Sequence, residues 1–401
     1  MIDRAARDIL TSALALALGA AVSLGLARFS YALLLPPMRA DLGWSYFTAG
    51  AMGTANAAGY LAGALAAPWL MARVGARTAC IAGTVAVGLL LMLHGLTRGE
   101  TELYALRVAS GAISAVIFVS GGLMAARLSL RGPPGSGINP GLVLGLYYGG
   151  TGWGIVASAL IVAPPGTHAM HWASAWQVLG MVSLAAAAVM AWRLRPTPPQ
   201  PVPGAGKARF DPRPFAFALA AYFMFGLGYI GYMTFIVTFL REQALPAHAA
   251  TAFFAVLGIG VAISPFLWAG LLQRHPDGRP LARLSLLLAL ATALPVLWAS
   301  PVAAYVSGSI FGAVFLSVVA ATTALVRHNL PQEQWPAGVS TFTIIFAVGQ
   351  IIGPGVVGVL ADGPGGLRAG LGLSACALLI GAALARAQRA VIPSESQRQT
   401  L

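Results

Sequence analysis

Long apolar runs separated by short polar segments dominate the chain. A bilayer core of roughly 30 Å needs about 20 apolar residues per crossing helix. The pattern predicts twelve such helices, with approximate cores at Leu10–Leu35, Phe47–Ala72, Ala79–Leu96, Leu103–Ala126, Pro140–Ala163, Trp172–Trp192, Phe215–Leu240, Thr251–Leu272, Leu281–Ala299, Val302–Val326, Gly338–Leu360 and Leu367–Ala387. The first run is too long for a cleaved signal peptide, so we expect it to be retained as a helix.

One polar segment interrupts the series. Residues 195–214 read RPTPPQPVPGAGKARFDPRP, and their proline and charge content forbids a membrane helix. We therefore expect a six-helix bundle at 1–194, a linker at 195–214 and a second six-helix bundle at 215–401. The halves repeat one another at an offset near 201 residues, so that Gly25 and Tyr31 match Gly226 and Tyr232. Parallel repeats with a substrate site at their interface form one established transporter plan.

Composition and charge support a membrane protein. Of the 401 residues, 58% are hydrophobic and 9% are charged, against about 25% charged in soluble domains. With the N-terminus inside, eighteen of the 24 Lys and Arg residues lie on the cytoplasmic side, as in bacterial inner-membrane proteins. We therefore expect a multi-pass protein of the bacterial cytoplasmic membrane, with both termini cytoplasmic and lipid around it. Its charge of +13 follows from this topology and does not indicate a nucleic-acid partner.

The sequence lacks motifs for enzymatic or metal chemistry. The segment Gly226–Gly231 matches G-x-G-x-x-G only formally, because no strand precedes it. Cys80 and Cys376 lie in apolar runs and support neither a disulfide nor a metal site. We expect no catalytic residue, metal, cofactor or ATPase activity. A membrane-embedded enzyme or a sensory receptor would require polar catalytic groups or a soluble signalling domain.

Arg28 is the most informative single residue. A charged side chain near the centre of a membrane helix costs about 2.5 to 3.5 kcal/mol on insertion scales. The eleven acidic residues all lie in loops or at helix ends, so none is placed to pair with it. An anionic substrate is then a natural partner for the guanidinium. The alternative is a structural Arg28 that bonds to backbone carbonyls or stacks on an aromatic ring such as Tyr31.

Several motifs resemble those of the major facilitator superfamily. The loop Arg73-Val-Gly-Ala-Arg77 resembles the family's signature, with Ala72 in place of its usual acidic residue. Arg107-Val-Ala-Ser-Gly111 resembles the family's Arg-x-x-x-Gly motif. The glycine-rich fifth helix, Gly145 to Gly154, resembles a motif often seen in antiporters and recurs as Gly349-Gln-Ile-Ile-Gly353-Pro354. The segment from Gly25 to Tyr31 with Pro36-Pro37, and Gly228-Tyr-Ile, also resemble the YbfB/YjiJ-like bacterial subgroup.

This resemblance implies an all-α fold of twelve transmembrane helices in two pseudo-symmetric six-helix bundles. It also implies gating or coupling roles, for which the candidates are Arg73, Arg77, Arg107, Gly149, Gly154, Gly353 and Pro354. Arg107 lies little more than one turn from Glu102, so it can instead snorkel to the outer interface. The glycines are better explained by close helix packing than by substrate contact.

The leading hypothesis is a secondary or facilitative transporter that moves a small organic anion by alternating access. The candidate substrate-binding residues are Arg28, Tyr31, Asn56, Tyr147, Tyr148, Tyr229, Tyr232 and Gln350. Single tyrosines can instead belong to the interfacial aromatic belt, and Asn or Gln can join helices. The runner-up is an exporter of neutral or amphiphilic compounds, of the drug or sugar efflux type.

We expect a monomer that binds a small-molecule substrate. Proton coupling, if present, would use edge groups such as Asp41, Glu102 or Asp362; facilitated diffusion and exchange stay open.

Overall fold

The computed structural model describes residues 4–130, 140–163, 170–194 and 210–391, and within these ranges the chain is helical and contains no strand. The segments are α1 (Arg4–Ala20), η1 (Ala21–Phe29), α2 (Tyr31–Leu42), α3 (Tyr46–Val74), α4 (Ala76–His94), α5 (Glu100–Ser129), α6 (Pro140–Val162), α7 (Trp172–Arg193), η2 (Arg213–Phe215), α8 (Ala216–Glu242), α9 (Ala247–Leu267), α10 (Ala269–Arg274), α11 (Arg279–Leu297), α12 (Pro301–Asn329), η3 (Gln332–Gln334), α13 (Trp335–Ala361) and α14 (Gly366–Ala387).

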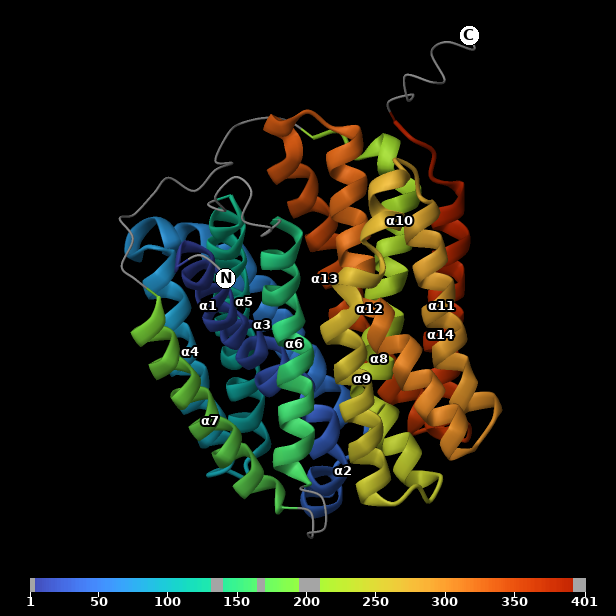
Figure 1. Cartoon of the computed structure of the whole chain (residues 1–401). Helices are drawn as coiled ribbons and strands as arrows, with labels where there is room; N and C mark the ends of the chain where they lie inside the picture. Colours follow the sequence, from blue (N-terminus) through green and yellow to red (C-terminus); the bar gives the residue numbers. More distant parts are fainter. Residues whose placement is uncertain (1–3, 131–139, 164–169, 195–209, 392–401) are drawn as a thin grey trace.

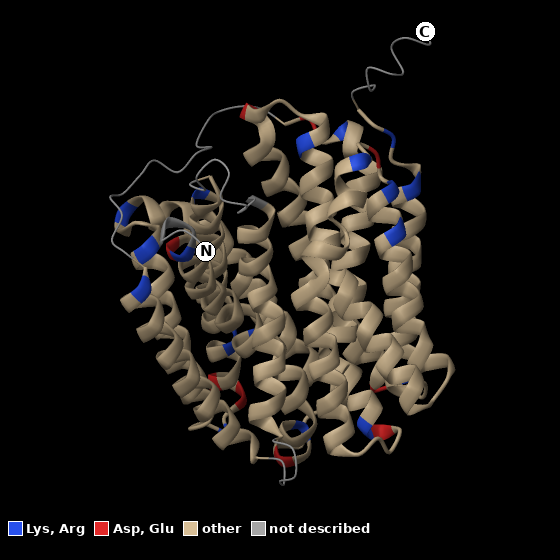
Figure 2. Ribbon diagram, in the orientation of Figure 1, with Lys and Arg blue, Asp and Glu red and all other residues tan. Residues whose placement is uncertain are grey.

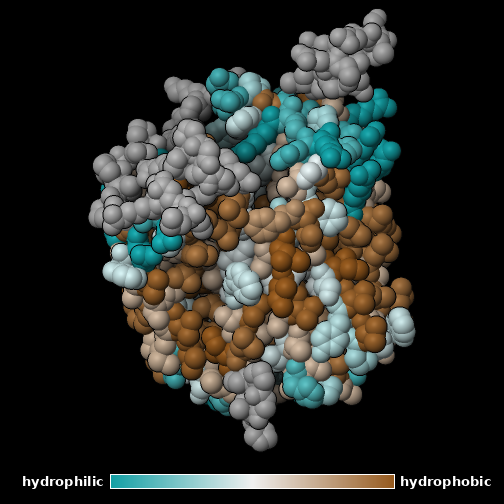
Figure 3. Space-filling view, in the orientation of Figure 1, coloured by the Kyte–Doolittle hydropathy of each residue, from teal (hydrophilic) through white to brown (hydrophobic). Residues whose placement is uncertain are grey.

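Eleven helical segments in the described ranges are long and apolar enough to cross a membrane. The twelfth predicted crossing is α3, whose 29 residues correspond to about 43 Å of helix. Its many small and polar residues make it less apolar than the other eleven segments. It packs between α5 and α13. Figure 3 shows the corresponding surface, a belt of hydrophobic residues between two hydrophilic ends. The prediction of a twelve-helix membrane fold is confirmed.

The helices form two groups that lie side by side in Figure 1, α1 to α7 and α8 to α14. We call these the first and the second group. The groups meet where α3 packs on α13, α6 on α9 and α2 on α8. Most of the predicted linker, residues 195–209, lies outside the described residues. Its last part is described, and there the ring of Phe210 lies 5.4 Å from that of Phe215.

The two ends of the bundle differ in charge. Arginines gather at the end where α3, α7, α10, α12 and α14 finish, which is the upper end in Figure 2. We call this the basic end; it carries Arg73, Arg193, Arg274, Arg327 and Arg386. The opposite end is where α2, α4, α8, α11 and α13 finish. This asymmetry is the one that the positive-inside pattern predicts.

The first crossing contains an irregular segment at the level of Arg28. The π-helix η1 separates α1 from α2, and the backbone N–H of Ser30 donates to the carbonyl of Gly25, five residues earlier. The helix then continues through Pro36 and Pro37 until Gly43, whose φ of 66° ends it. π-Helical turns often occur at functional sites because they change the direction in which side chains project.

The glycines of α6 allow it to pack closely on two sides. A Cβ at Gly152 would overlap the backbone of α9 at Ala262, and a Cβ at Gly149 would lie 2.9 Å from the carbonyl oxygen of Ala262. On another face, Gly154 packs against the backbone of Ala21. Since α9 belongs to the second group and Ala21 to the first, α6 is packed closely on both groups without side chains in between.

Candidate functional site

A cavity of about 660 Å³ lies between the two groups of helices. Its walls come from η1, α3, α5 and α6 on one side and from α8, α9, α10, α12 and α13 on the other. The lining includes the exposed side chains of Arg327 and His328, at the end of α12, so the cavity opens toward the basic end. Its size is within the range of small-molecule sites.

Arg28 lines the inner part of this cavity and is only 6% exposed. Its guanidinium donates a hydrogen bond to Oε1 of Gln350, which lies on α13 in the second group. Its Cζ lies 5.0 Å from the ring centroid of Tyr60 and 5.9 Å from that of Phe29. No acidic residue is found among the described lining residues. The charge of Arg28 therefore has neutral partners only.

Stacked aromatic rings form the wall of the cavity on the second group. Tyr222, Phe225 and Tyr229 lie on one face of α8, and the ring of Phe346 from α13 stacks on all three at centroid distances of 4.7, 5.4 and 5.6 Å. Phe315 of α12 stacks on Tyr229 at 5.9 Å. Such stacks supply apolar surface at low conformational cost.

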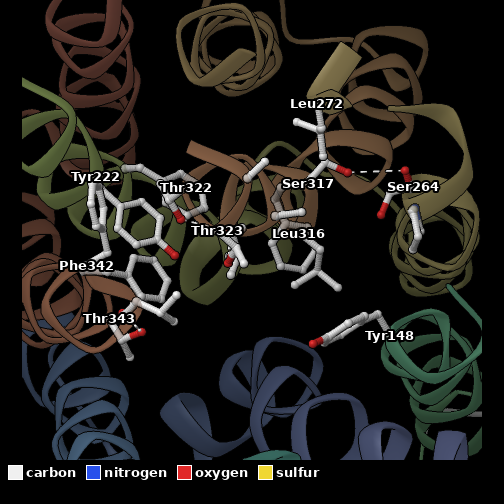
Figure 4. Close-up of a pocket in the computed structure, with 18 of the residues that line it drawn as sticks. Tyr148, Tyr222, Ser264, Leu272, Leu316, Ser317, Thr322, Thr323, Phe342 and Thr343 are labelled. Atoms are coloured by element: carbon white, nitrogen blue, oxygen red, sulfur yellow. Dashed lines mark hydrogen bonds between the residues drawn. The ribbon is translucent and has the colours of Figure 1, made fainter. Parts of the chain in front are cut away.

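Hydroxyl groups supply most of the polar character of the remaining wall. Ser317 Oγ donates to the carbonyl oxygen of Ser264 at 3.3 Å, which ties α12 to α9. Thr322 and Thr323 each donate to the carbonyl of Val319 in their own helix, which leaves their hydroxyl oxygens as acceptors. Tyr148 of α6 projects into the cavity from the side opposite these α12 residues (Figure 4).

Arg107, Tyr31 and Asn56 form a separate cluster inside the first group. Arg107 is 3% exposed and donates to the backbone carbonyls of Met52 and Ala27, both at 3.3 Å. Its Cζ lies 4.4 Å from the ring centroid of Tyr31, and Asn56 Nδ2 donates to its carbonyl oxygen at 3.1 Å. Arg107 therefore does not snorkel to the end of the bundle. The hydrogen bonds of its guanidinium connect α5 to α3 and to η1.

The eight candidate substrate-binding residues fall into three sets. Arg28, Tyr148, Tyr229 and Gln350 line the large cavity. Tyr31 and Asn56 line a small pocket of about 20 Å³ beside Arg28 and Arg107. The other two, Tyr147 and Tyr232, are fully buried away from the cavity. The Tyr147 hydroxyl donates to the carbonyl of Phe118 at 2.6 Å, and the Tyr232 hydroxyl forms a hydrogen bond of 2.6 Å with Ser307 Oγ.

At the basic end, the candidate gating residues Arg73 and Arg77 have hydrogen-bond and ring partners in their own group among the described residues. Arg73 stacks on Trp69, with Cζ 4.0 Å from the ring centroid. Arg77 donates to the carbonyls of Leu194 and Ala191 at 2.7 and 2.9 Å, at the end of α7. Contacts of this kind agree with a cavity that is open at the basic end.

The remaining gating candidates lie where helices pack most closely. Gly149 and Gly154 make the α6 contacts described above, Gly353 packs on the backbone of Leu227 in α8, and Pro354 packs on Gly50 in α3. The last of these contacts joins the two groups, because α3 and α13 belong to different groups.

The opposite end is closed by polar contacts between the groups. The carboxylate of Asp362, just after α13, accepts hydrogen bonds from the backbone N–H groups of Tyr46 and Phe47 at 2.8 Å each. Tyr46 also donates to Glu242 at the end of α8. Arg39 of α2 lies over the Tyr46 ring, with Cζ 3.7 Å from its centroid.

Sequence analysis did not nominate several residues of the cavity wall. Tyr60 lies four residues after Asn56 on α3, and Tyr222 and Phe225 lie seven and four residues before Tyr229 on α8. Phe346 lies four residues before Gln350 on α13. These spacings place each of them on the face of a nominated residue. Helical periodicity counted outward from Asn56, Tyr229 and Gln350 was the signal that could have found them.

Comparison with solved structures shows transporters of the same fold. A bacterial homologue of the human lysosomal transporter Spinster, in an inward-facing and occupied conformation, matches with a TM-score of 0.71 at 16% identity, covering 96% of this chain and 97% of that chain. The nucleoside transporter NupG matches with a TM-score of 0.74 at 12% identity (95% and 100%), and the human organic anion transporter MFSD10 with 0.60 at 14% (96% and 100%). At these identities the likeness concerns the fold.

A family model provides the sequence-level assignment. The model described as "Uncharacterised MFS-type transporter YbfB" matches residues 20–386, which include the helices from η1 to α13, nearly all of α14 and the described lining residues of the cavity. No curated protein matches the sequence. The chain therefore belongs to the YbfB family of MFS-type transporters, within the major facilitator superfamily.

Proposed function

We propose that this transporter moves a small organic anion across the bacterial cytoplasmic membrane by alternating access. The basic end faces the cytoplasm, in accordance with the positive-inside rule, and both termini are cytoplasmic. In this orientation the structure corresponds to the inward-facing state, with a cavity open at the basic end and polar contacts closing the opposite end. One chain contains the complete cavity, which agrees with a monomer.

Arg28 is the observation that carries the anion proposal. Arg107, which is also buried in the first group, has two backbone carbonyls and an aromatic ring as partners and lies away from the large cavity. Arg28 faces that cavity, and among the described residues its guanidinium has one hydrogen-bond acceptor, the neutral amide oxygen of Gln350, beside the rings of Tyr60 and Phe29. A carboxylate accepts paired hydrogen bonds from a guanidinium, and such charge-assisted bonds are roughly twice as strong as neutral ones. The bound anion would thus supply the counter-charge that no described lining residue supplies.

The aromatic wall indicates what the rest of the substrate is like. Tyr222, Phe225, Tyr229 and Phe346 present stacked rings next to Arg28, with few charged groups nearby. A substrate with one anionic group and an apolar or aromatic body matches both features. The same wall also supports the second candidate, an exporter of neutral or amphiphilic compounds, in which Arg28 is structural.

Ligand-induced thermal stabilisation of the purified protein tests the proposal, because ligand binding raises apparent stability by mass action. The panel contains aromatic and aliphatic carboxylates, phosphates, sugars and amphiphilic cations. We expect carboxylates to stabilise the wild type and to lose this effect in Arg28→Ala. Arg327→Ala, which removes the same charge at the cavity mouth, is the matched control and should retain most of the stabilisation.

Counterflow in proteoliposomes then measures transport of any compound that binds. Loss of counterflow in Arg28→Ala, with normal insertion and unfolding temperature, would agree with the anion transporter. Stabilisation confined to neutral or cationic compounds and unchanged in Arg28→Ala would instead support the exporter.

A further inference from the structure

Three side chains from the two groups meet at the inner part of the cavity. Arg28 of η1 and Tyr229 of α8 both donate hydrogen bonds to Oε1 of Gln350 on α13, the second at 3.0 Å. Arg28, Gln350 and Tyr229 are 6, 2 and 4% exposed. A guanidinium has donors only, so the oxygen of the Gln350 amide must face it. One amide oxygen thus occupies the position in front of Arg28 where an anionic oxygen would bind.

We propose that Gln350 is an internal, displaceable ligand of Arg28, whose place is taken by the anionic group of the substrate. This inference rests on the proposed function, since it assumes that Arg28 binds the anion. In the empty protein the amide oxygen accepts a hydrogen bond from the guanidinium without cancelling its charge. A carboxylate offers a stronger, charge-assisted bond at the same position and therefore displaces the amide. The Tyr229 hydroxyl, released from Gln350, donates to the incoming carboxylate.

The exchange also changes how the two groups of helices are connected. Arg28 belongs to the first group, whereas Gln350 and Tyr229 belong to the second, so the Arg28–Gln350 bond ties the groups directly. Once a ligand takes the place of the amide, that direct tie is broken, and the ligand itself connects Arg28 to Tyr229. Gln350 thereby couples substrate binding to the motion of one group relative to the other. A ligand drives such motion only through different interaction energies in the two states.

This role explains why residue 350 is polar but uncharged. A carboxylate here would form a lasting ion pair with Arg28 and compete with the substrate for it. An aliphatic side chain would remove the hydrogen-bond acceptor and leave Arg28 with only the Tyr60 and Phe29 rings. A glutamine lies between these extremes. It selects ligands that carry a full negative charge, because only those bind Arg28 more strongly than the amide does.

The test compares charge variants of two glutamines in the same cavity. Gln350→Glu places a carboxylate against Arg28, and Gln350→Leu removes the internal ligand. Gln273→Glu is the matched control, because Gln273 lines the cavity at α10, among the residues of the basic end, and receives the same charge. The probes are benzoate and hexanoate, with methyl benzoate as the uncharged counterpart, and the dissociation constant is measured by thermal stabilisation and calorimetry.

We expect Gln350→Glu to weaken binding of the carboxylate probes by about ten-fold or more, because bonds to charged groups are the strong ones. Gln273→Glu should weaken it by a much smaller factor. Gln350→Leu should bind the probes as tightly as the wild type or more tightly, since no internal ligand competes. Methyl benzoate should bind weakly to all variants. Equal effects of the two glutamate variants, or a loss in Gln350→Leu as large as in Arg28→Ala, would overturn the displaceable-ligand model.

A ligand-free measurement separates this inference from the proposed function. In the empty protein, spin-label distances across the opposite end should show a larger open population in Gln350→Leu than in the wild type, and a smaller one in Gln350→Glu. Unchanged distances would overturn the tie between the groups even if carboxylates bind to Arg28. Conversely, binding of the carboxylate probes that is unchanged in Arg28→Ala, or no binding of them to the wild type, would contradict the proposed function itself.

Discussion

Asp362, which follows α13, accepts a hydrogen bond of 2.8 Å from the backbone N–H of Tyr46, the first residue of α3. A second bond of 2.8 Å comes from Phe47. The two donors are among the N–H groups that a helix leaves unpaired at its start, where negative charge is favourable. A carboxylate of the second group therefore caps a helix of the first, and this contact must break before the opposite end can open.

We predict that Asp362→Asn increases the population that is open at the opposite end. Loss of a charged cap costs about 1 kcal/mol, which corresponds to a roughly five-fold change in the ratio of the two states. Spin-label distances across that end measure the shift. Asp277→Asn is the control, because Asp277 pairs with Arg279 inside the second group. An equal shift in the two variants would show that Asp362 has no special role in closure.

We predict that Arg107→Ala destabilises the protein more than Arg28→Ala does. Arg107 donates to the buried carbonyls of Met52 and Ala27, and its removal loses two hydrogen bonds from a charged group, each worth about 1.5 to 3 kcal/mol. Arg28→Ala removes a charge that only neutral groups compensate. Thermal unfolding in detergent without ligand compares the two. A larger loss of stability in Arg28→Ala would mean that Arg28 is the structural arginine.

We predict that Gly152→Leu disrupts the packing between α6 and α9 and reduces transport strongly. A Cβ at Gly152 would already overlap the backbone of Ala262, so the two groups would be forced apart at this contact. Gly372→Leu is the control, because nothing lies within 4 Å of a Cβ built there. Counterflow and spin-label distances across the basic end provide the measurements. Equal activity of the two variants would contradict the close packing of α6 on α9.

We predict that Tyr229→Phe weakens carboxylate binding by a few-fold and leaves stability nearly unchanged. The ring would keep its stacking on Phe346 and Phe315, whereas the hydroxyl, which donates to Gln350 in the empty protein and to the carboxylate in the proposed bound state, would be lost. Tyr232→Phe is matched chemically, but its hydroxyl bonds to Ser307 away from the cavity, so binding should not change. Calorimetry with benzoate distinguishes the two variants, and a loss only in Tyr232→Phe would contradict this assignment.

The sequence was sufficient to predict the fold because each membrane crossing is a local property. About 20 apolar residues between polar loops indicate a helix without any knowledge of its neighbours. The predicted run Trp172–Trp192 differs from α7 by one residue, and Pro140–Ala163 differs from α6 by one. The first crossing extends furthest beyond its predicted core among the described helices, from Arg4 to Leu42.

The site was less predictable because it depends on which helix faces meet. The charge of Arg28 was enough to place it toward the interior, but Gln350 as its partner follows only from the packing of η1 near α13. His94 shows the same limitation. It is the last residue of α4, and only the packing of α4 on α7 determines that it is 1% exposed, with its ring 4.8 Å from that of Trp176.

The guanidinium of Arg28 also has an electrical consequence. In the proposed anion transporter, the empty carrier would turn with the positive charge of Arg28 unbalanced, while a carrier loaded with a monoanion would turn with that charge balanced. The cavity is open to one side of the membrane, so the voltage drop falls mainly across the closed end. The electrical potential at Arg28 is then close to that of the side that the cavity faces. Each elementary charge moved through 100 mV changes the free energy by about 2.3 kcal/mol. A negative cell interior would thus stabilise the inward-facing form of the empty carrier. The membrane voltage would therefore change the rate at which the empty carrier turns from inward-facing to outward-facing, and not the rate at which the anion-loaded carrier turns.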